Sequence, residues 1–206
     1  RLSHNGVTTD GHSRLFVSTW ERGVALGQGA RGHVLVLDPS SRRWRRFATL
    51  PRARDGHCAV WHAGLLYVAG GISCSTGILT NSFHVYSEAT GLWEELPAMP
   101  HACVWAASGV IGNELFIASG MSGPESNTLQ IYDIAARTWR LGAPLPVVQI
   151  TGSKKPRGVV VDGKLFLFTR QIHRTLVYDP LYNMWTEEAV PEGDFSVWYG
   201  GACAHE

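Results

Sequence analysis

The sequence predicts an all-β protein built from repeated four-stranded units. Short segments rich in Val, Leu, Phe and Tyr are separated by Gly, Pro, Asp and Asn, which is the pattern of strands and turns. No stretch keeps helical periodicity beyond about three turns. Segments of one kind also recur along the 206 residues at a nearly constant interval, which is the sequence signature of a repeat architecture.

The first marker of the repeat is a short apolar strand that contains one aromatic residue, Phe or Tyr. The stretch "LLYV" at 65–68 has three relatives, "RLFV" at 14–17, "ELFI" at 114–117 and "KLFL" at 164–167. Their aromatic residues Phe16, Tyr67, Phe116 and Phe166 lie 51, 49 and 50 residues apart. This spacing predicts four copies of one unit.

The second marker is a tryptophan at a fixed distance from a second strand. The strands "VLVLD", "FHVYS", "LQIYD" and "TLVYD" are each followed, six residues after their last residue, by a tryptophan. These are Trp44, Trp93, Trp139 and Trp185. A period of about 48 residues with such phasing is in the range of β-propeller blades. We expect these tryptophans to pack between adjacent blades, on the last strand of each.

Each period supplies four strands, here called A to D. In the second period we expect them at 57–61, 65–69, 82–86 and 93–96. The tight A–B links at 62–64, 111–113 and 161–163 each contain a glycine, which allows the positive φ that such links often require.

On these residues the chain resembles the kelch-repeat β-propellers. Their signature is a strand that closes on Gly-Gly, followed by a Tyr and a Trp at fixed separation, and "LLYVAGG", Tyr86 and Trp93 match it in full. The other copies depart from it: Gly-Gly becomes Ser119-Gly120, Thr169-Arg170 and Ser18-Thr19, and Leu37 replaces the tyrosine. The resemblance implies an all-β, kelch-type propeller, in which Gly70-Gly71 is a turn and not a phosphate-binding loop.

The expected blades are about 4–50, 54–98, 101–143 and 155–190, and 198–206 looks like the first strand of a further blade. We expect residues 1–206 to be a propeller region of a longer chain. A propeller must hide its edge strands by closure. Either further chain completes the ring, which we favour because the tail begins a new blade, or four blades close and the tail pairs with the first.

The links between strands predict which face binds. The C–D interval is constant, whereas the interval from the strand-B aromatic to the matched position in strand C is 21, 19, 16 and 12 residues. The B–C and D–A links lie on one face, so the variation in link length is confined to that face. Binding residues lie disproportionately on variable loops held by a rigid scaffold.

The candidate partner-binding residues are the arginines and aromatic residues of those links. The arginines are Arg22, Arg31, Arg54, Arg157, Arg170 and Arg174, and the aromatic residues are Trp20, Trp105, Trp198 and Tyr199. Arg, Trp and Tyr are the residue types that anchor protein partners. For Arg54 and Arg157 the alternative is that they brace neighbouring blades.

No catalytic, cofactor or metal site is predicted. The nine histidines form no metal-binding motif, and neither a nucleophile elbow nor a nucleotide-binding glycine loop is present. The four cysteines are irregularly spaced, which favours reduced thiols in a cytoplasmic or nuclear protein. With a net charge of +1 and no basic block, neither nucleic acid nor a membrane is an expected partner.

The expected function is therefore recognition of a protein or peptide, with an acidic or phosphorylated segment favoured by the arginines. The stretch "VLVLDPSSRRWRRF" followed by "LPRAR" resembles F-box/kelch proteins. That resemblance implies an adaptor that joins ubiquitin-ligase subunits through a domain outside this chain. The rival hypothesis is a propeller enzyme, a metal-dependent lyase or oxidase with its site in the central mouth.

Overall fold

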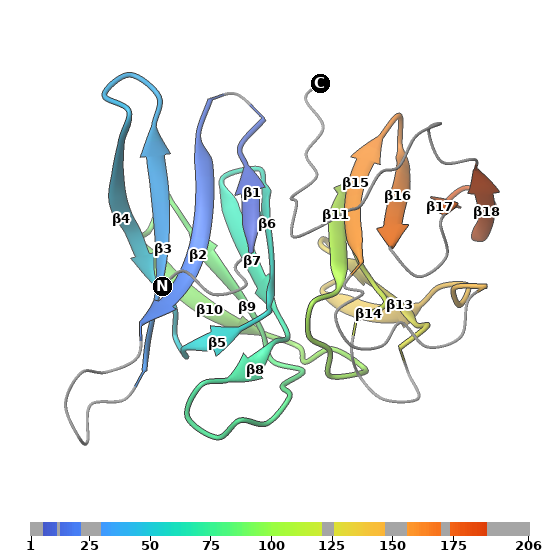
Figure 1. Cartoon of the computed structure of the whole chain (residues 1–206), viewed down its shortest axis with the longest axis horizontal. Coiled ribbons are helices and arrows are strands. Elements are labelled where there is room, and N and C mark those ends of the chain that lie inside the picture. Colours follow the sequence, from blue (N-terminus) through green and yellow to red (C-terminus); the bar gives the residue numbers. More distant parts are fainter. Residues whose placement is uncertain are drawn as a thin grey trace. The chain divides into compact units, whose positions relative to one another are not determined.

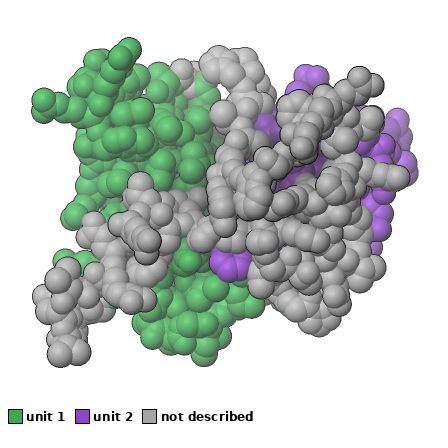
Figure 2. Space-filling model, viewed as in Figure 1, with its two compact units in different colours: residues 1–104, 206 green, residues 105–205 purple. Residues whose placement is uncertain are grey.

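The computed structural model describes residues 6–11, 13–21, 30–120, 126–146, 156–169 and 174–188. The chain divides into two compact units, residues 1–104 with 206 and residues 105–205, coloured separately in Figure 2. Each unit holds two four-stranded antiparallel sheets, and no helix occurs among the described residues (Figure 1). It follows that the described part of the chain has no helix capable of crossing a bilayer. The prediction of an all-β fold of four-stranded units is confirmed.

The sheets are called blades one to four in chain order, and each lies within one of the four expected ranges. Blade one is β1 (Val7–Thr9), β2 (Leu15–Glu21), β3 (Arg31–Asp38) and β4 (Arg43–Thr49). Blade two is β6 (Cys58–His62), β7 (Leu65–Ala69), β9 (Phe83–Ser87) and β10 (Leu92–Leu96). Blade three is β11 (Ala107–Ile111), β12 (Glu114–Ala118), β13 (Leu129–Asp133) and β14 (Thr138–Leu141). Blade four is β15 (Arg157–Val161), β16 (Lys164–Thr169), β17 (Arg174–Asp179) and β18 (Met184–Glu188).

Two short strands add a separate ribbon to unit 1. They are β5 (Arg54–Asp55), in the link that enters blade two, and β8 (Ile72–Ser73), in the link between β7 and β9. The pairing Arg54↔Ser73 fastens a D–A link to a B–C link. The expected tail strand at 198–206 lies outside the described residues.

The four C–D turns share one design. Each connects its strands with four residues, at 39–42, 88–91, 134–137 and 180–183. The last residue of each turn has a positive φ: 52° at Arg42, 70° at Gly91, 58° at Arg137 and 50° at Asn183. In three of them an Asp at the end of strand C accepts a backbone hydrogen bond within the turn, as Asp133 does from Ala136 N at 2.8 Å. Constant length therefore reflects a single backbone conformation.

Blades one and two pack face to face through aromatic side chains. Phe16 is stacked on Trp61 with ring centroids 4.5 Å apart, and Phe47 meets Tyr86 edge-on at 5.3 Å. The core that these rings border includes Val34, Val36, Leu66 and Val68. In unit 2, blades three and four share a core of the same kind, which includes Phe116, Ile131, Leu165 and Tyr178.

The repeated tryptophans divide into a packed group and one exposed member. Trp93, Trp139 and Trp185 each face the tyrosine of the neighbouring strand in their own blade, at centroid distances of 5.2, 5.0 and 5.2 Å. Trp93 also borders the core between blades one and two, and Trp185 donates a hydrogen bond to the carbonyl of Ala143 at 2.9 Å. These two contacts confirm packing between blades.

For Trp44 that prediction is wrong, since 47% of this residue is exposed. Its cross-strand partner is Leu37 and not a tyrosine. Residues of alternate rows in a strand face opposite sides of the sheet. Phe16, Val34 and Val36 face blade two, so the row of Trp44 and Leu37 faces away from it.

The paired glycines of the repeat serve a close backbone contact. Gly70 and Gly71 have φ values of 65° and 100°, and Gly71 N donates to the carbonyl of Cys103 at 2.7 Å. A Cβ at Gly70 would lie 2.6 Å from that oxygen, and one at Gly71 would lie 2.8 Å from the carbonyl oxygen of Asp55. The turn therefore excludes side chains on two grounds, conformation and space.

We expect Trp93→Ala to lower the free energy of unfolding by about 3 kcal/mol, the low end for a core tryptophan because Trp93 is only half-buried. Trp44→Ala, at the equivalent position, is the matched control and should cost markedly less because of its exposure. Urea unfolding of both variants is the measurement. Similar losses would contradict the assignment of Trp93 to the core between the blades.

We expect Gly71→Ala to destabilise unit 1 by about 2 kcal/mol or more, because a left-handed φ and a backbone clash act together. Gly77→Ala is the control: its φ is 70°, but a Cβ there has no heavy atom within 4 Å. Only the conformational cost, roughly 1 kcal/mol, should remain. Thermal or urea unfolding that fails to separate the two variants would show that the close approach contributes nothing.

Candidate functional site

The B–C links vary in length as the sequence predicts. They span nine residues at 22–30, thirteen at 70–82, ten at 119–128 and four at 170–173. The link at 70–82 is described throughout.

The 70–82 link is a folded segment held by its own hydrogen bonds. Ser73 N donates to Ile78 O at 2.9 Å, and Thr80 N donates to Gly71 O at 2.9 Å. A β-bridge joins Ile72 to Leu79. The tip is thus fixed, with Ile78 67% exposed and Leu79 37% exposed.

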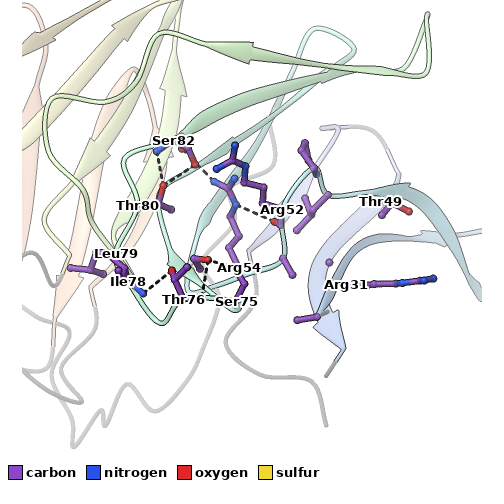
Figure 3. A pocket seen from close by; sticks show the side chains of 16 residues that line it. Arg31, Thr49, Arg52, Arg54, Ser75, Thr76, Ile78, Leu79, Thr80 and Ser82 are labelled. Atoms are coloured by element: carbon purple, nitrogen blue, oxygen red, sulfur yellow. Dashed lines mark hydrogen bonds between the residues drawn. The ribbon is translucent and has the colours of Figure 1, made fainter. Parts of the chain in front are cut away.

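A pocket of about 550 Å³ lies between this link and the end of blade one. Its walls come from residues 30–32, 49–54 and 73–82, and therefore from B–C and D–A links together (Figure 3). The lining includes three arginines and six Ser or Thr residues, and it contains no Asp or Glu. The aliphatic residues Ile78 and Leu79 belong to the same lining.

Arg54 forms the interior of this site, with only 1% of its surface exposed. Its guanidinium donates to the carbonyls of Gly70 and Ser82 at 3.2 and 3.3 Å, and it lies 3.4 Å from His84 Nδ1. A weaker contact from Nε reaches Arg52 O at 3.4 Å. Burial, and then the like charge of Arg52, lower the pKa of Arg54 to about 10, so it stays charged at neutral pH.

The expectation that Arg54 is an exposed partner anchor is therefore wrong. A buried cation must be hydrogen-bonded, and here the acceptors are backbone carbonyls of the pocket walls. The bracing alternative is closer to what is observed, although the segments that Arg54 joins enter or belong to blade two. It is a positioning residue that fixes the 52–54 and 70–82 segments.

Arg31 and Arg52 are the exposed cations of the lining. Figure 3 shows the Arg52 side chain beside that of Arg54, whereas the Arg31 side chain points away from both. Arg52 is also the cation whose charge lowers the pKa of the buried guanidinium. Arg52, Ile78 and Leu79 were not among the binding residues predicted from the sequence. An aliphatic pair between turn-forming residues in "STGILTNS" is the signal that could have found Ile78 and Leu79.

The remaining candidates are distributed over both units. Arg157 opens β15, is half-buried, and donates to Pro156 O at 3.1 Å. Trp105 has a φ of 59° and is half-buried in the link before β11. By backbone position, Trp20 lies near the end of β2 and Arg174 at the start of β17, next to B–C links. Arg22, Arg170, Trp198 and Tyr199 lie outside the described residues.

Three of the four cysteines lie in the described segments, and none of the three, Cys58, Cys74 and Cys103, is in a disulfide. Burial raises the pKa of Cys74 to about 11 and that of Cys103 well above its ordinary value. Cys203 lies outside the described residues. Among the residues that the structure describes, no three His, Cys, Asp or Glu side chains come together as a metal site.

Beside the pocket, a buried histidine links blade two to blade one. His57 Nε2 lies 2.6 Å from Ser18 Oγ, and Ser18 Oγ donates to Gly6 O at 3.1 Å. His57 is 5% exposed, and burial together with the charge of Arg54 lowers its pKa to about 3. The imidazole is therefore neutral at physiological pH.

Comparison with known proteins agrees with this architecture. The family model of the Kelch motif matches residues 53–100 and 103–146. The chain is 29% identical to a putative F-box/kelch-repeat protein of Arabidopsis thaliana, over 86% of this chain and 52% of that protein. It is 22% identical to human Kelch domain-containing protein 3, over 81% of this chain and 49% of that protein.

The chain is a kelch-repeat protein. The solved structure of YjhT superposes with a TM-score of 0.70 over 94% of this kelch chain and 66% of that chain, at 16% identity. With that likeness, the fold is a kelch-type β-propeller. The kelch chain spans about half the length of the curated relatives it matches first. Another relative, at 28% identity over 69% of this chain and 27% of its own length, is zebrafish (Danio rerio) Kelch repeat and BTB domain-containing protein 12.

We expect the kelch protein to lose stability as the pH falls from about 6.5 towards 3. The folded-state pKa of His57 lies below that of an unfolded histidine, so the unfolded chain binds more protons in this window. At pH 4.5 this difference in proton binding at His57 should lower the free energy of unfolding by about 2–3 kcal/mol relative to pH 7.

Urea unfolding at pH 7 and pH 4.5 measures this loss, and His57→Gln should show less of it. His62→Gln, at the partly exposed last residue of β6, the strand that follows His57, is the matched control. The same loss in all three proteins would exclude His57 as its source.

Proposed function

We propose that this kelch protein recognises a protein partner through the face formed by its B–C and D–A links. Kelch relatives support a protein-interaction propeller in general. The observation that carries the proposal is the pocket between blades one and two, where basic, hydroxyl and aliphatic side chains meet without a carboxylate. Arginine and exposed aliphatic side chains around a preformed hollow are suited to anchoring a partner.

The proposed partner segment is acidic or phosphorylated. Guanidinium groups bind carboxylates and phosphates with paired, charge-assisted hydrogen bonds. The net charge of the whole chain is only +1, so attraction depends on this local concentration of arginine. Arginines on the described part of the opposite face, such as Arg42 and Arg137, lie in turns whose conformation all four blades share.

The proposed setting is a ubiquitin ligase, with this propeller as the adaptor that holds the substrate. The names of three relatives point this way: two carry the term F-box/kelch-repeat and one carries Kelch repeat and BTB domain-containing. The ligase-binding domain would belong to the rest of a longer protein. A cytoplasmic or nuclear location fits this role.

We expect a displayed library of random peptides, selected against the chain, to be enriched in Asp and Glu, and phosphorylation of the library to increase its capture. Arg31→Glu and Arg157→Glu should each reduce capture by roughly tenfold, because each places a negative charge on the binding face. The measurement is the amount of library bound at low and high salt, since screening should weaken the contact.

Arg42→Glu and Arg137→Glu are the matched controls, because both are charge reversals in C–D turns. They should leave capture within about twofold of the unchanged protein. Equal losses from both pairs, or no acidic enrichment, would contradict recognition by this face.

A further inference from the structure

The pocket combines a rigid apolar wall with a basic wall. The apolar wall is the tip of the 70–82 link, where Ile78 is 67% exposed and Leu79 37% exposed. Gly77 N donates to Ser73 O at 2.8 Å and Cys74 N donates to Ala53 O at 3.0 Å, so this tip is fastened to itself and to the D–A link. Two aliphatic side chains are thus held in solvent by a segment that has little freedom left to lose on binding.

The basic wall is the D–A link at residues 52–54. Arg52 is exposed and Arg54 is buried, and Figure 3 shows their side chains beside each other. Arg54 has no carboxylate within ion-pair distance among the described residues, and its acceptors are carbonyls and His84. The carboxylate with the largest effect on its pKa is Glu95, an exposed residue of β10 outside the pocket lining. Two neighbouring cations, one of them desolvated, give this wall its positive charge.

Hydroxyl groups lie between the two walls. Thr80 Oγ1 and Ser82 Oγ are 3.0 Å apart, and Ser82 O accepts a hydrogen bond from Arg54. The other hydroxyl residues of the lining are Thr49, Ser73, Ser75 and Thr76. Such groups can donate to anionic oxygens that reach the basic wall.

We propose that this pocket recognises a two-part motif in a peptide: an aliphatic side chain next to an anionic one. The aliphatic side chain packs on Ile78 and Leu79, and the anionic side chain is bound by Arg52, with Arg54 holding the wall in place. The anion is a side-chain carboxylate or a phosphate monoester. Both are negatively charged and accept hydrogen bonds from a guanidinium group. The inference rests on the proposed function and narrows it to one site and one class of sequence.

The test is NMR titration of the isotope-labelled 206-residue chain with four acetylated and amidated peptides. They have the sequence Gly-Ser-Leu-Xaa-Ser-Gly, where Xaa is aspartate, phosphoserine or serine, and the fourth carries alanine for leucine beside aspartate. Concentrations up to roughly 5 mM detect a dissociation constant near 1 mM. The aspartate or phosphoserine peptide should shift amide signals of residues 50–54 and 73–80, with at least roughly tenfold weaker binding of the serine peptide.

Two variants assign the walls separately. Arg52→Gln should weaken the binding of the aspartate and phosphoserine peptides by roughly tenfold and leave the binding of the serine peptide unchanged. A variant with both Ile78→Ser and Leu79→Ser should bind the leucine and alanine peptides equally well. It should still bind the aspartate peptide more tightly than the serine peptide. Arg42→Gln, an exposed arginine of a C–D turn, is the control and should change nothing.

The relative strength of the two anionic peptides identifies the anion. A stronger phosphoserine peptide assigns the site to phosphorylated partners, and a stronger aspartate peptide assigns it to acidic ones. The absence of shifts in 50–54 and 73–80, or equal binding of all four peptides, would overturn the proposal. If that occurred while Arg157→Glu, a change outside the pocket lining, still lost library capture, partner recognition by this face would stand and its assignment to this pocket would fall.

Discussion

The candidate site depends on one buried charge. The guanidinium of Arg54 has almost no contact with solvent, and its hydrogen bonds go to the carbonyl of Arg52 and to those of Gly70 and Ser82 at the two ends of the 70–82 link. An unsatisfied buried cation would be strongly unfavourable, so these carbonyls must stay where the guanidinium can reach them. The positions of Arg52, Ser82 and the loop that carries Ile78 and Leu79 follow from that requirement.

The two kinds of link obey different constraints. The C–D turns repeat a positive φ at their last residue and are therefore limited to one length and a few residue types. The 70–82 link is stabilised by contacts particular to it, such as the ribbon formed by β5 and β8 and the bridge between Ile72 and Leu79. A segment that supplies its own stabilisation is free to differ from its counterparts in other blades, and diversity on one face results.

Much of the fold could be predicted because its signals are periodic and local. The Tyr86–Trp93 interval fixes the register of strands β9 and β10, so the spacing in the sequence is also a contact in space. The expected strands of blade two agree with the observed ones to within one residue. The paired glycines were assigned to a turn, and their positive φ values and close contacts with Cys103 and Asp55 provide the physical reason.

The errors concern burial, which periodicity does not specify. Trp44 has the same spacing as its three counterparts, but it belongs to the first sheet of the chain, and its row faces the side opposite blade two. Arg54 was counted as a surface residue because it lies in a link, although the link folds over it. Ile78 and Leu79 were overlooked because a short apolar pair in a loop resembles an ordinary buried strand until its exposure is known.

Small residues at the first strands of neighbouring sheets have a further consequence. A Cβ at Gly6 would lie 2.6 Å from that of Ala59, and one at Gly109 would lie 2.5 Å from Val160 Cγ2. The outer strands β4 and β10 are instead separated by rings such as Phe47, Tyr86 and Trp93. In unit 1 the two sheets therefore form a wedge, thin at the first strand and thick at the last. The volumes of the inner and outer side chains set the angle of that wedge, and the angle sets how many sheets complete a circle. Larger inner residues would reduce the angle and so favour a ring of more sheets.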